Sequence, residues 1–158
     1  MDKYGRHSGG LFVYGDPSGR HEDTRTVAGH NDFNIIRKEL KGMYPQILLL
    51  SKAPSVAMRG TFINAIFRDK EQGIEITINE QCTNLINDML FGKQASDGTK
   101  FKEKGKDKET GISVEKYHHF SDGMDYLICK MFINEYNEFK RGFSNFDYSM
   151  PFSKKFQR

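Results

Sequence analysis

The stretch YHHFSDGMDYLICKMF, residues 117–132, begins with a histidine pair and an aspartate and continues into an apolar helical stripe. Apolar side chains recur every three or four positions from Ser121 to about Phe139, which predicts one long, partly buried helix. Ser121 is a favourable N-cap, and Asp122 then lies in the first turn, where the helix dipole stabilises an anion. Capping explains Asp122 but not the histidine pair beside it.

The segments before this helix alternate between strand and helix patterns. Short apolar or alternating runs bounded by turn residues predict three strands, at residues 11–16, 46–51 and 73–79. Apolar residues at helical spacing predict three helices, at residues 31–42, 58–69 and 82–91. The alternation of strands and helices favours an α/β fold, with a mostly parallel sheet flanked by helices.

Length and composition limit the number of domains, the size of the core and the compartment of the protein. A chain of 158 residues with 37% hydrophobic residues can hold one domain with a modest core. The longest apolar runs are far below the roughly 20 residues that cross a bilayer, so we expect a cytoplasmic protein with no membrane partner. Cys82 and Cys129 lack the spacing of a metal site, and their apolar neighbours predict reduced core thiols.

The net charge of +3 is unevenly distributed. Residues 100–108, KFKEKGKDK, alternate lysine with other residues and predict an extended hairpin or a mobile loop. Residues 140–158 form a basic tail with interleaved aromatics, so we expect a domain at 1–139 followed by a flexible tail. Both basic segments could lie along a phosphate backbone, and a solvated loop and a disordered end are the alternatives.

Two aspartates come from separate elements of the predicted fold. Asp16 ends the first strand, in YGDPSG, and Asp122 begins the last helix. Functional groups gather at the carboxyl ends of parallel strands, and Mg²⁺ binds through a few carboxylates while it keeps waters for substrate phosphates. Two such ions can cleave a phosphodiester. Aspartate is also common at strand ends and helix starts, so a structural role stays open.

Five segments, in this order, resemble the C-terminal nuclease region of the large terminase subunits of tailed bacteriophages, especially crAss-like phages: GLFVYGDPSGR, DTRTVAGHNDFNIIRKEL, MRGTFINAIF, INEQCTNLINDM and HHFSDGMDYLICKMF. The resemblance extends to about residue 135. It implies an RNase H-like fold and an endonuclease that uses two Mg²⁺ or Mn²⁺ ions to cut concatemeric phage DNA during packaging in the host cytoplasm. The implied partners are double-stranded DNA, the terminase ATPase portion, the portal and the small terminase subunit.

The resemblance also assigns roles to single residues. It makes Asp16 the second acid of the metal triad and Asp122 the last, with His119 orienting Asp122 or contacting DNA. Asp88 could add a carboxylate, although placement on a helix surface is the alternative, and Asp125 is expected to face solvent. Basic candidates for holding DNA phosphates are Arg59, for which a structural ion pair is an equal alternative, and Lys100, Lys102, Lys104, Lys106 and Lys108. Further candidates to line the same cleft are Ser18, Thr24 and Arg25, for which a plain turn is the alternative.

The chain departs from the family pattern at its beginning. The family's first acid lies on an earlier strand, and nothing before Leu11 supplies it. No Walker A sequence occurs, so we expect a C-terminal piece from a split or interrupted gene, lacking the first strands of the fold and exposing a sheet edge. A non-catalytic module that binds DNA, the portal or the motor is the main alternative. A nucleotide-binding turn at residues 15–19 is a further one.

Overall fold

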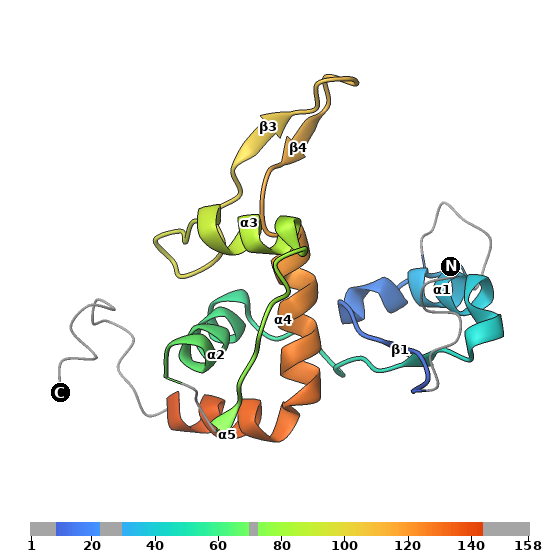
Figure 1. Ribbon diagram of the computed structural model, residues 1–158, viewed down its shortest axis with the longest axis horizontal. Coiled ribbons are helices and arrows are strands. Elements are labelled where there is room, and N and C mark those ends of the chain that lie inside the picture. The colour runs from blue at the N-terminus through green and yellow to red at the C-terminus, as the bar shows by residue number, and fades with distance from the viewer. Residues whose placement is uncertain (1–8, 23–29, 70–72, 144–158) are drawn as a thin grey trace.

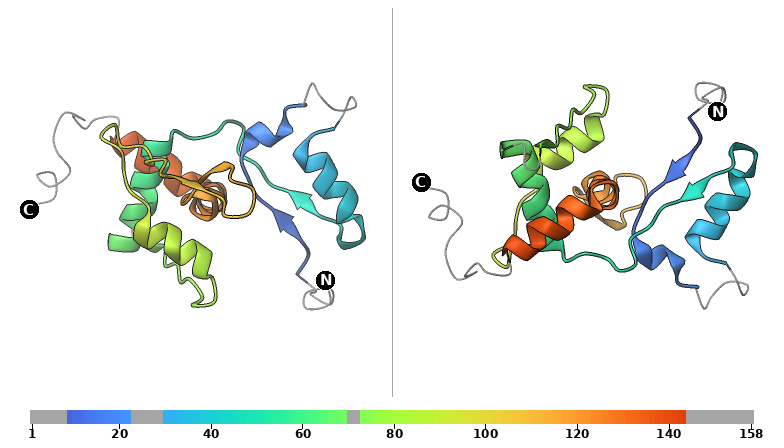
Figure 2. Two further views of the ribbon diagram at one scale, coloured as in Figure 1. Left: turned by 90° about the horizontal axis from the view of Figure 1, so that it is seen from above. Right: turned by 90° about the horizontal axis from the view of Figure 1, so that it is seen from below.

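The computed structural model describes residues 9–22, 30–69 and 73–143. This part of the chain is a mixed α/β structure with five α-helices and two separate two-stranded sheets. Residues 9–22 and 30–50 form an N-terminal unit, which lies to one side of a helical unit made by residues 56–143 (Figures 1 and 2). A hairpin projects from the helical unit (Figure 1).

The N-terminal unit is built on one short parallel strand pair. Strand β1 (Phe12–Val13) pairs in parallel with β2 (Gln46–Ile47). The ladder continues on both sides of β2, where the Gln46 N–H donates to the Leu11 carbonyl and the Leu48 N–H to the Val13 carbonyl, each at 2.8 Å. Strands therefore form within the two predicted segments and pair in parallel, although each strand is only two residues long.

Helix α1 (Asp32–Glu39) connects these strands and confirms the helix predicted at 31–42. Asn31 is its N-cap, because its side chain accepts a hydrogen bond from the Asn34 N–H at 2.9 Å. Buried Phe33 covers the turn after β1, which contains the 3₁₀-helix η1 (Pro17–Arg20). A Cβ added at Gly19 would lie 2.9 Å from the Phe33 ring, so this turn is packed against α1 rather than open as a phosphate cradle.

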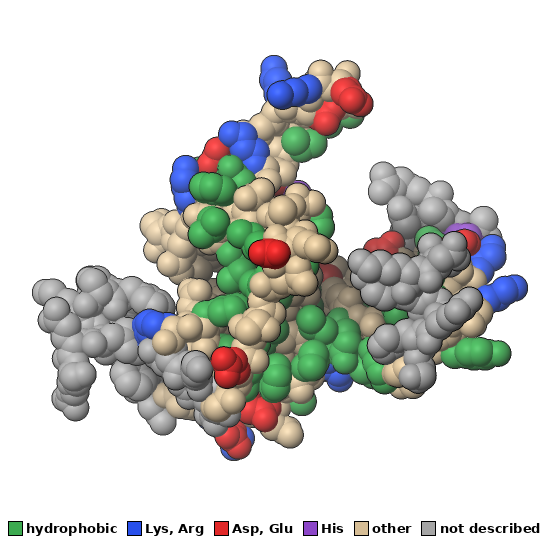
Figure 3. Space-filling model, in the orientation of Figure 1, with side chains coloured by type: hydrophobic (Ala, Val, Ile, Leu, Met, Phe, Trp, Pro, Cys, Tyr) green, Lys and Arg blue, Asp and Glu red, His purple; other side chains and the backbone are tan. Residues whose placement is uncertain are grey.

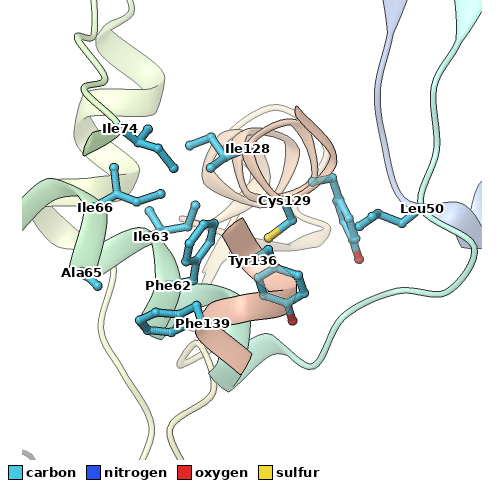
Figure 4. Packing of buried hydrophobic residues seen from close by; sticks show 11 residues of the cluster. Leu50, Phe62, Ile63, Ala65, Ile66, Ile74, Ile128, Cys129, Tyr136 and Phe139 are labelled. Atoms are coloured by element: carbon cyan, nitrogen blue, oxygen red, sulfur yellow. The ribbon is translucent and has the colours of Figure 1, made fainter. Parts of the chain in front are cut away.

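Most of the core lies in the helical unit, between α2 (Val56–Asp69), α4 (His119–Met131) and α5 (Ile133–Phe143), and Leu50 of the N-terminal unit belongs to the same cluster. Phe62 is fully buried, and its ring lies 5.4 Å from Tyr136 and 5.2 Å from Phe139, measured between centroids (Figure 4). The single helix predicted from Ser121 to Phe139 is wrong, because the chain turns at Phe132 between α4 and α5. The turn allows Tyr136 and Phe139 of α5 to reach Phe62.

The strand predicted at 73–79 is also wrong, because these residues pair with no strand in the described part of the chain. The alternation of isoleucines still identifies the buried side, since Ile74 packs into the core (Figure 4). Periodicity shows which side chains are buried, whereas strand pairing also needs a neighbouring backbone. One mostly parallel sheet flanked by helices is therefore not formed by the described residues.

An extended hairpin or a mobile loop was predicted for the lysine-rich segment, and the segment forms a hairpin. Helix α3 (Thr83–Phe91) precedes it, and β3 (Lys104–Lys106) pairs antiparallel with β4 (Ser113–Glu115).

Helix α5 extends to Phe143, so the predicted tail begins within a helix, and residues 144–158 lie outside the described residues. Cys129 is buried as predicted, whereas Cys82 is exposed. Among the described helices, none combines the length and the apolar character needed to cross a membrane.

Candidate functional site

One open cleft of about 680 Å³ collects most of the residues predicted to act together. It is bordered by the turn after β1, the start of α2, the segment that leads to the hairpin, and the first turns of α4. Six predicted site residues line it: Asp16, Arg59, Lys100, Lys102, His119 and Asp122. We call it the acidic cleft, since two aspartates from distant parts of the sequence meet there.

Asp122 lies in the first turn of α4, as predicted, and is bound by two cations. Its Oδ1 accepts hydrogen bonds from Arg59 Nη2 at 2.5 Å and from Lys100 Nζ at 2.9 Å. Partial burial by itself would raise the pKa of Asp122, but Lys100 and Arg59 outweigh it and hold this pKa below its usual range. Asp122 is therefore an ionised carboxylate that remains 41% exposed to the cleft.

Asp125, one turn further along α4, shares both cations. Arg59 Nε lies 3.3 Å and Lys100 Nζ 2.8 Å from Asp125 Oδ2. The expectation that Asp125 faces solvent is wrong, because its side chain is only 4% exposed, and this burial raises its pKa against the pull of Lys100 and Arg59. The Arg59 side chain is 5% exposed, which corresponds to the structural alternative for this arginine.

Asp16 is held through both of its carboxylate oxygens. Oδ1 accepts from the Ser18 N–H at 2.8 Å, so Asp16 is also the N-cap of η1. Oδ2 accepts from the Tyr126 hydroxyl at 2.8 Å. Burial acts to raise the pKa of Asp16, but the hydrogen bonds from Ser18 and Tyr126 prevail and lower it. Asp16 is thus an ionised group at the edge of the N-terminal unit.

Tyr126 was missed by the sequence analysis. Its hydroxyl accepts a hydrogen bond from Arg59 Nη1 at 2.9 Å, and the Arg59 guanidinium lies 4.6 Å from the centre of its ring. A signal existed, because Asp122, Asp125 and Tyr126 are spaced three and four residues apart and so share one face of a helix. Nothing in the sequence showed that an arginine from another helix faces them.

Asp88 has a different place from the one predicted. Its carboxylate is buried and accepts hydrogen bonds from the N–H groups of Phe120 at 2.8 Å and Ser121 at 3.0 Å, so it caps α4 from α3 and does not line the acidic cleft. The alternative prediction, that Asp88 lies on the surface of its helix, is wrong as well. Ser121 is not the N-cap, since that position belongs to His118, which has a left-handed φ of 85° and makes no capping bond with its side chain.

The lysines of residues 100–108 divide into two sets. Lys100 and Lys102 line the cleft, and Lys102 also pairs with Glu115 at 2.7 Å. Lys104 and Lys106 are exposed on one side of β3, and neither forms an ion pair with a described residue. Lys108 lies in the turn after β3. Figure 3 shows basic side chains along the projecting hairpin.

Of the further candidates, Ser18 does not line this cleft. Ser18 contributes its backbone N–H to Asp16. Thr24 and Arg25 lie outside the described residues.

The acidic cleft matches a divalent-metal site in part. Asp16 and Asp122 supply the carboxylate oxygens that Mg²⁺ prefers. However, Arg59 and Lys100 already neutralise Asp122, and within the described ranges no three His, Cys, Asp or Glu side chains are grouped to hold a metal ion. By themselves the described residues do not fit the two-ion centre that the resemblance implies.

Comparison of the chain with protein families, curated proteins and solved structures gives no match in any of the three.

Proposed function

We propose that this chain is a nuclease region of a phage DNA-packaging terminase, with an RNase H-like fold, and that it engages double-stranded DNA at the acidic cleft. The observation that carries the proposal is the convergence of Asp16 and Asp122 on one cleft, from positions more than 100 residues apart in the sequence. The two acids come from different structural units.

The surroundings of the acids suit a nucleic-acid backbone. Lys102 lies at the cleft, and Lys104 and Lys106 follow on the hairpin, so lysines extend away from the acids of the cleft. Glu103 and Glu115 of the hairpin pair with Lys116 and Lys102. Alternate residues of an extended strand lie about 6.6 Å apart on one side, which allows successive lysines to approach successive phosphates. Contacts of this kind position the duplex and carry little sequence information, so weak sequence preference is expected.

Catalysis by this proposal needs more acid than the described residues place in the cleft. The two-ion centre of the resemblance requires a further carboxylate from outside the described ranges or from a partner chain. Within the described part, Asp16 and Asp122 offer oxygen ligands. Lys100 is held by Asp122 and Asp125, so exposed Lys102 is the lysine of the cleft that can approach a phosphate oxygen.

The test is cleavage of supercoiled plasmid by the purified chain with Mg²⁺, Mn²⁺ or EDTA. Asp16→Asn and Asp122→Asn should each abolish metal-dependent nicking, because neutral amides bind divalent cations weakly. Glu138→Gln, an exposed change on α5, is the matched control and should cut like the wild type. A folded wild-type chain that cuts with neither metal would refute catalysis by this chain alone.

A non-catalytic DNA-binding module is the second candidate. It is favoured by the ion pairs of Asp122 with Arg59 and Lys100, which leave this acid neutralised inside the chain itself. In this case Asp16→Asn and Asp122→Asn should bind a fluorescent DNA duplex as the wild type does, in EDTA as well as in Mg²⁺. Loss of cleavage without loss of binding in these variants would instead support the nuclease.

A further inference from the structure

The Tyr126 hydroxyl lies between the two acids of the cleft. It donates to Asp16 Oδ2 at 2.8 Å and accepts from Arg59 Nη1 at 2.9 Å, and Arg59 Nη2 in turn donates to Asp122 Oδ1 at 2.5 Å. A chain of three hydrogen bonds therefore runs from Asp16 through Tyr126 and Arg59 to Asp122. Two side chains thus connect the carboxylates that the proposed function needs.

The direction of these bonds is fixed by chemistry. A guanidinium has donors and no acceptor, and an ionised carboxylate has acceptors and no donor. The hydroxyl must therefore accept from Arg59 and give its single proton to Asp16. Burial raises the pKa of Tyr126, which keeps that proton in place at neutral pH. The arrangement is compatible with one orientation of the hydroxyl.

The position of the ring is fixed as well. Tyr126 is 7% exposed, and the Arg59 guanidinium lies over its face at 4.6 Å. Arg59 comes from α2 and Tyr126 from α4, so the pair belongs to the packed helical unit. Asp16 belongs to the N-terminal unit, whose strand pair is two residues long. The hydroxyl accordingly connects the packed helical unit to an acid in the turn that follows β1.

We propose that Tyr126 is a positioning residue, whose hydroxyl acts with Arg59 to set the relative placement of Asp16 and Asp122 across the cleft. The connection between the two acids stands on the hydrogen bonds alone. Its consequence for DNA cleavage rests on the proposed function. A displacement of about 1 Å can lower a reaction rate by about 10²-fold, so the loss of one hydrogen bond at this place is expected to reduce turnover.

Tyr126→Phe tests the connection because it removes the hydroxyl and keeps the ring over Arg59. The matched control is Tyr136→Phe, a second buried tyrosine, whose ring packs against Phe62. The measurement is the carboxyl ¹³C NMR signals of Asp16 and Asp122 at constant neutral pH, without metal or DNA. We expect Tyr126→Phe to move both signals and Tyr136→Phe to move neither. Unchanged signals in a folded Tyr126→Phe chain would overturn the proposal.

Cleavage kinetics test the functional half. In Tyr126→Phe we expect kcat for plasmid nicking to fall about 10-fold to 100-fold with KM and duplex affinity unchanged, since positioning acts on the reacting geometry and not on DNA binding. An unchanged kcat would overturn the catalytic role of the hydroxyl. If the wild type does not cut, the proposed function fails, and the carboxyl signals still decide whether Tyr126 places the two acids.

Discussion

Arg59 and Asp125 form an ion pair inside the helical unit, with Arg59 Nε 3.3 Å from Asp125 Oδ2 and the two side chains 5% and 4% exposed. The pair joins α2 to α4 beside the acidic cleft, which Arg59 lines. A buried ion pair contributes little compared with a well-packed apolar contact, but the removal of one partner leaves an uncompensated charge in the interior. The cleft is therefore sensitive to the loss of either member.

Arg59→Met should lower the free energy of unfolding by about 3–5 kcal/mol, because it removes the guanidinium beside Asp125 and leaves Lys100 as the remaining cation. Urea denaturation followed by circular dichroism measures this loss. Arg37→Met, on the exposed side of α1, is the control and should change stability by about 0.5 kcal/mol or less. A loss below about 1 kcal/mol in Arg59→Met would show that the pair does not hold α2 to α4.

Asp88→Ala should destabilise the chain by about 1–3 kcal/mol, since it leaves the N–H groups of Phe120 and Ser121 without their acceptor. Asp88→Asn keeps one side-chain oxygen and should cost less than the alanine change. Thermal unfolding of the wild type and of both variants at one pH ranks the three chains by stability. Equal losses in the two variants would mean that the oxygen does not cap α4.

Gly92→Ala should be destabilising by about 1–3 kcal/mol because of crowding. A Cβ at Gly92 would lie 2.4 Å from the Asp88 carbonyl oxygen and 2.5 Å from His118 Cε1. Gly142→Ala is the opposite case, since a Cβ there meets nothing within 4 Å on an α-helix, and it should stabilise by about 0.4–1 kcal/mol. Denaturant midpoints of the two variants should move in opposite directions, and a Gly92→Ala chain as stable as the wild type would contradict the packing around His118.

Lys104→Gln combined with Lys106→Gln should weaken duplex binding and reduce the slope of log affinity against log salt by about 1 per lysine, if each side chain contacts a phosphate. Fluorescence anisotropy at several salt concentrations measures the slope. Lys38→Gln on α1 is the control, exposed and distant from the hairpin in sequence and fold, and should leave the slope unchanged. An unaltered slope in the hairpin variant would exclude this side of β3 from the DNA contact.

The loss of stability at acid pH should depend on Asp122. Its pKa is lowered in the folded chain, so its contribution is fully present above the ordinary value of 3.8 and is lost as the pH falls through the folded pKa. Asp122→Asn should therefore lose less stability than the wild type between neutral pH and pH values below 3.8, as seen in melting temperatures. The pKa of Asp125 is raised, so Asp125→Asn should produce the opposite change, a steeper loss towards acid.

Local patterns in the sequence were sufficient for several elements. Asn31 before an apolar period predicted where α1 begins, because a cap and the helix it begins are adjacent in the chain. The isoleucines of 73–79 predicted the buried side of that segment but not the absence of a strand pairing, since pairing depends on a backbone elsewhere. The bend at Phe132 left no mark in the periodicity, because the apolar stripes of α4 and α5 continue across it.

The sequence predicted the acids of the candidate site but not the side chains that bind them. Asp16 and Asp122 stand at element boundaries that a short pattern identifies, and the structure places both in one cleft. The sequence did not show the hydrogen-bonded link between the acids, because its two members, Arg59 and Tyr126, come from different helices and meet only after α2 packs on α4. Asp88 was misplaced for the same reason, since its partners are 32 and 33 residues away in the sequence.

The cap of α4 has a consequence for the order of folding. A helix that carries its own N-cap can begin from a few neighbouring residues, whereas α4 obtains its acceptor from Asp88, 32 residues before Phe120. The chain between them, which includes the whole hairpin, must close into a loop before the cap can form, and that closure costs entropy before the hydrogen bonds compensate for it. The first turn of α4, where Asp122 lies, is thus completed by a long-range contact and not by local nucleation.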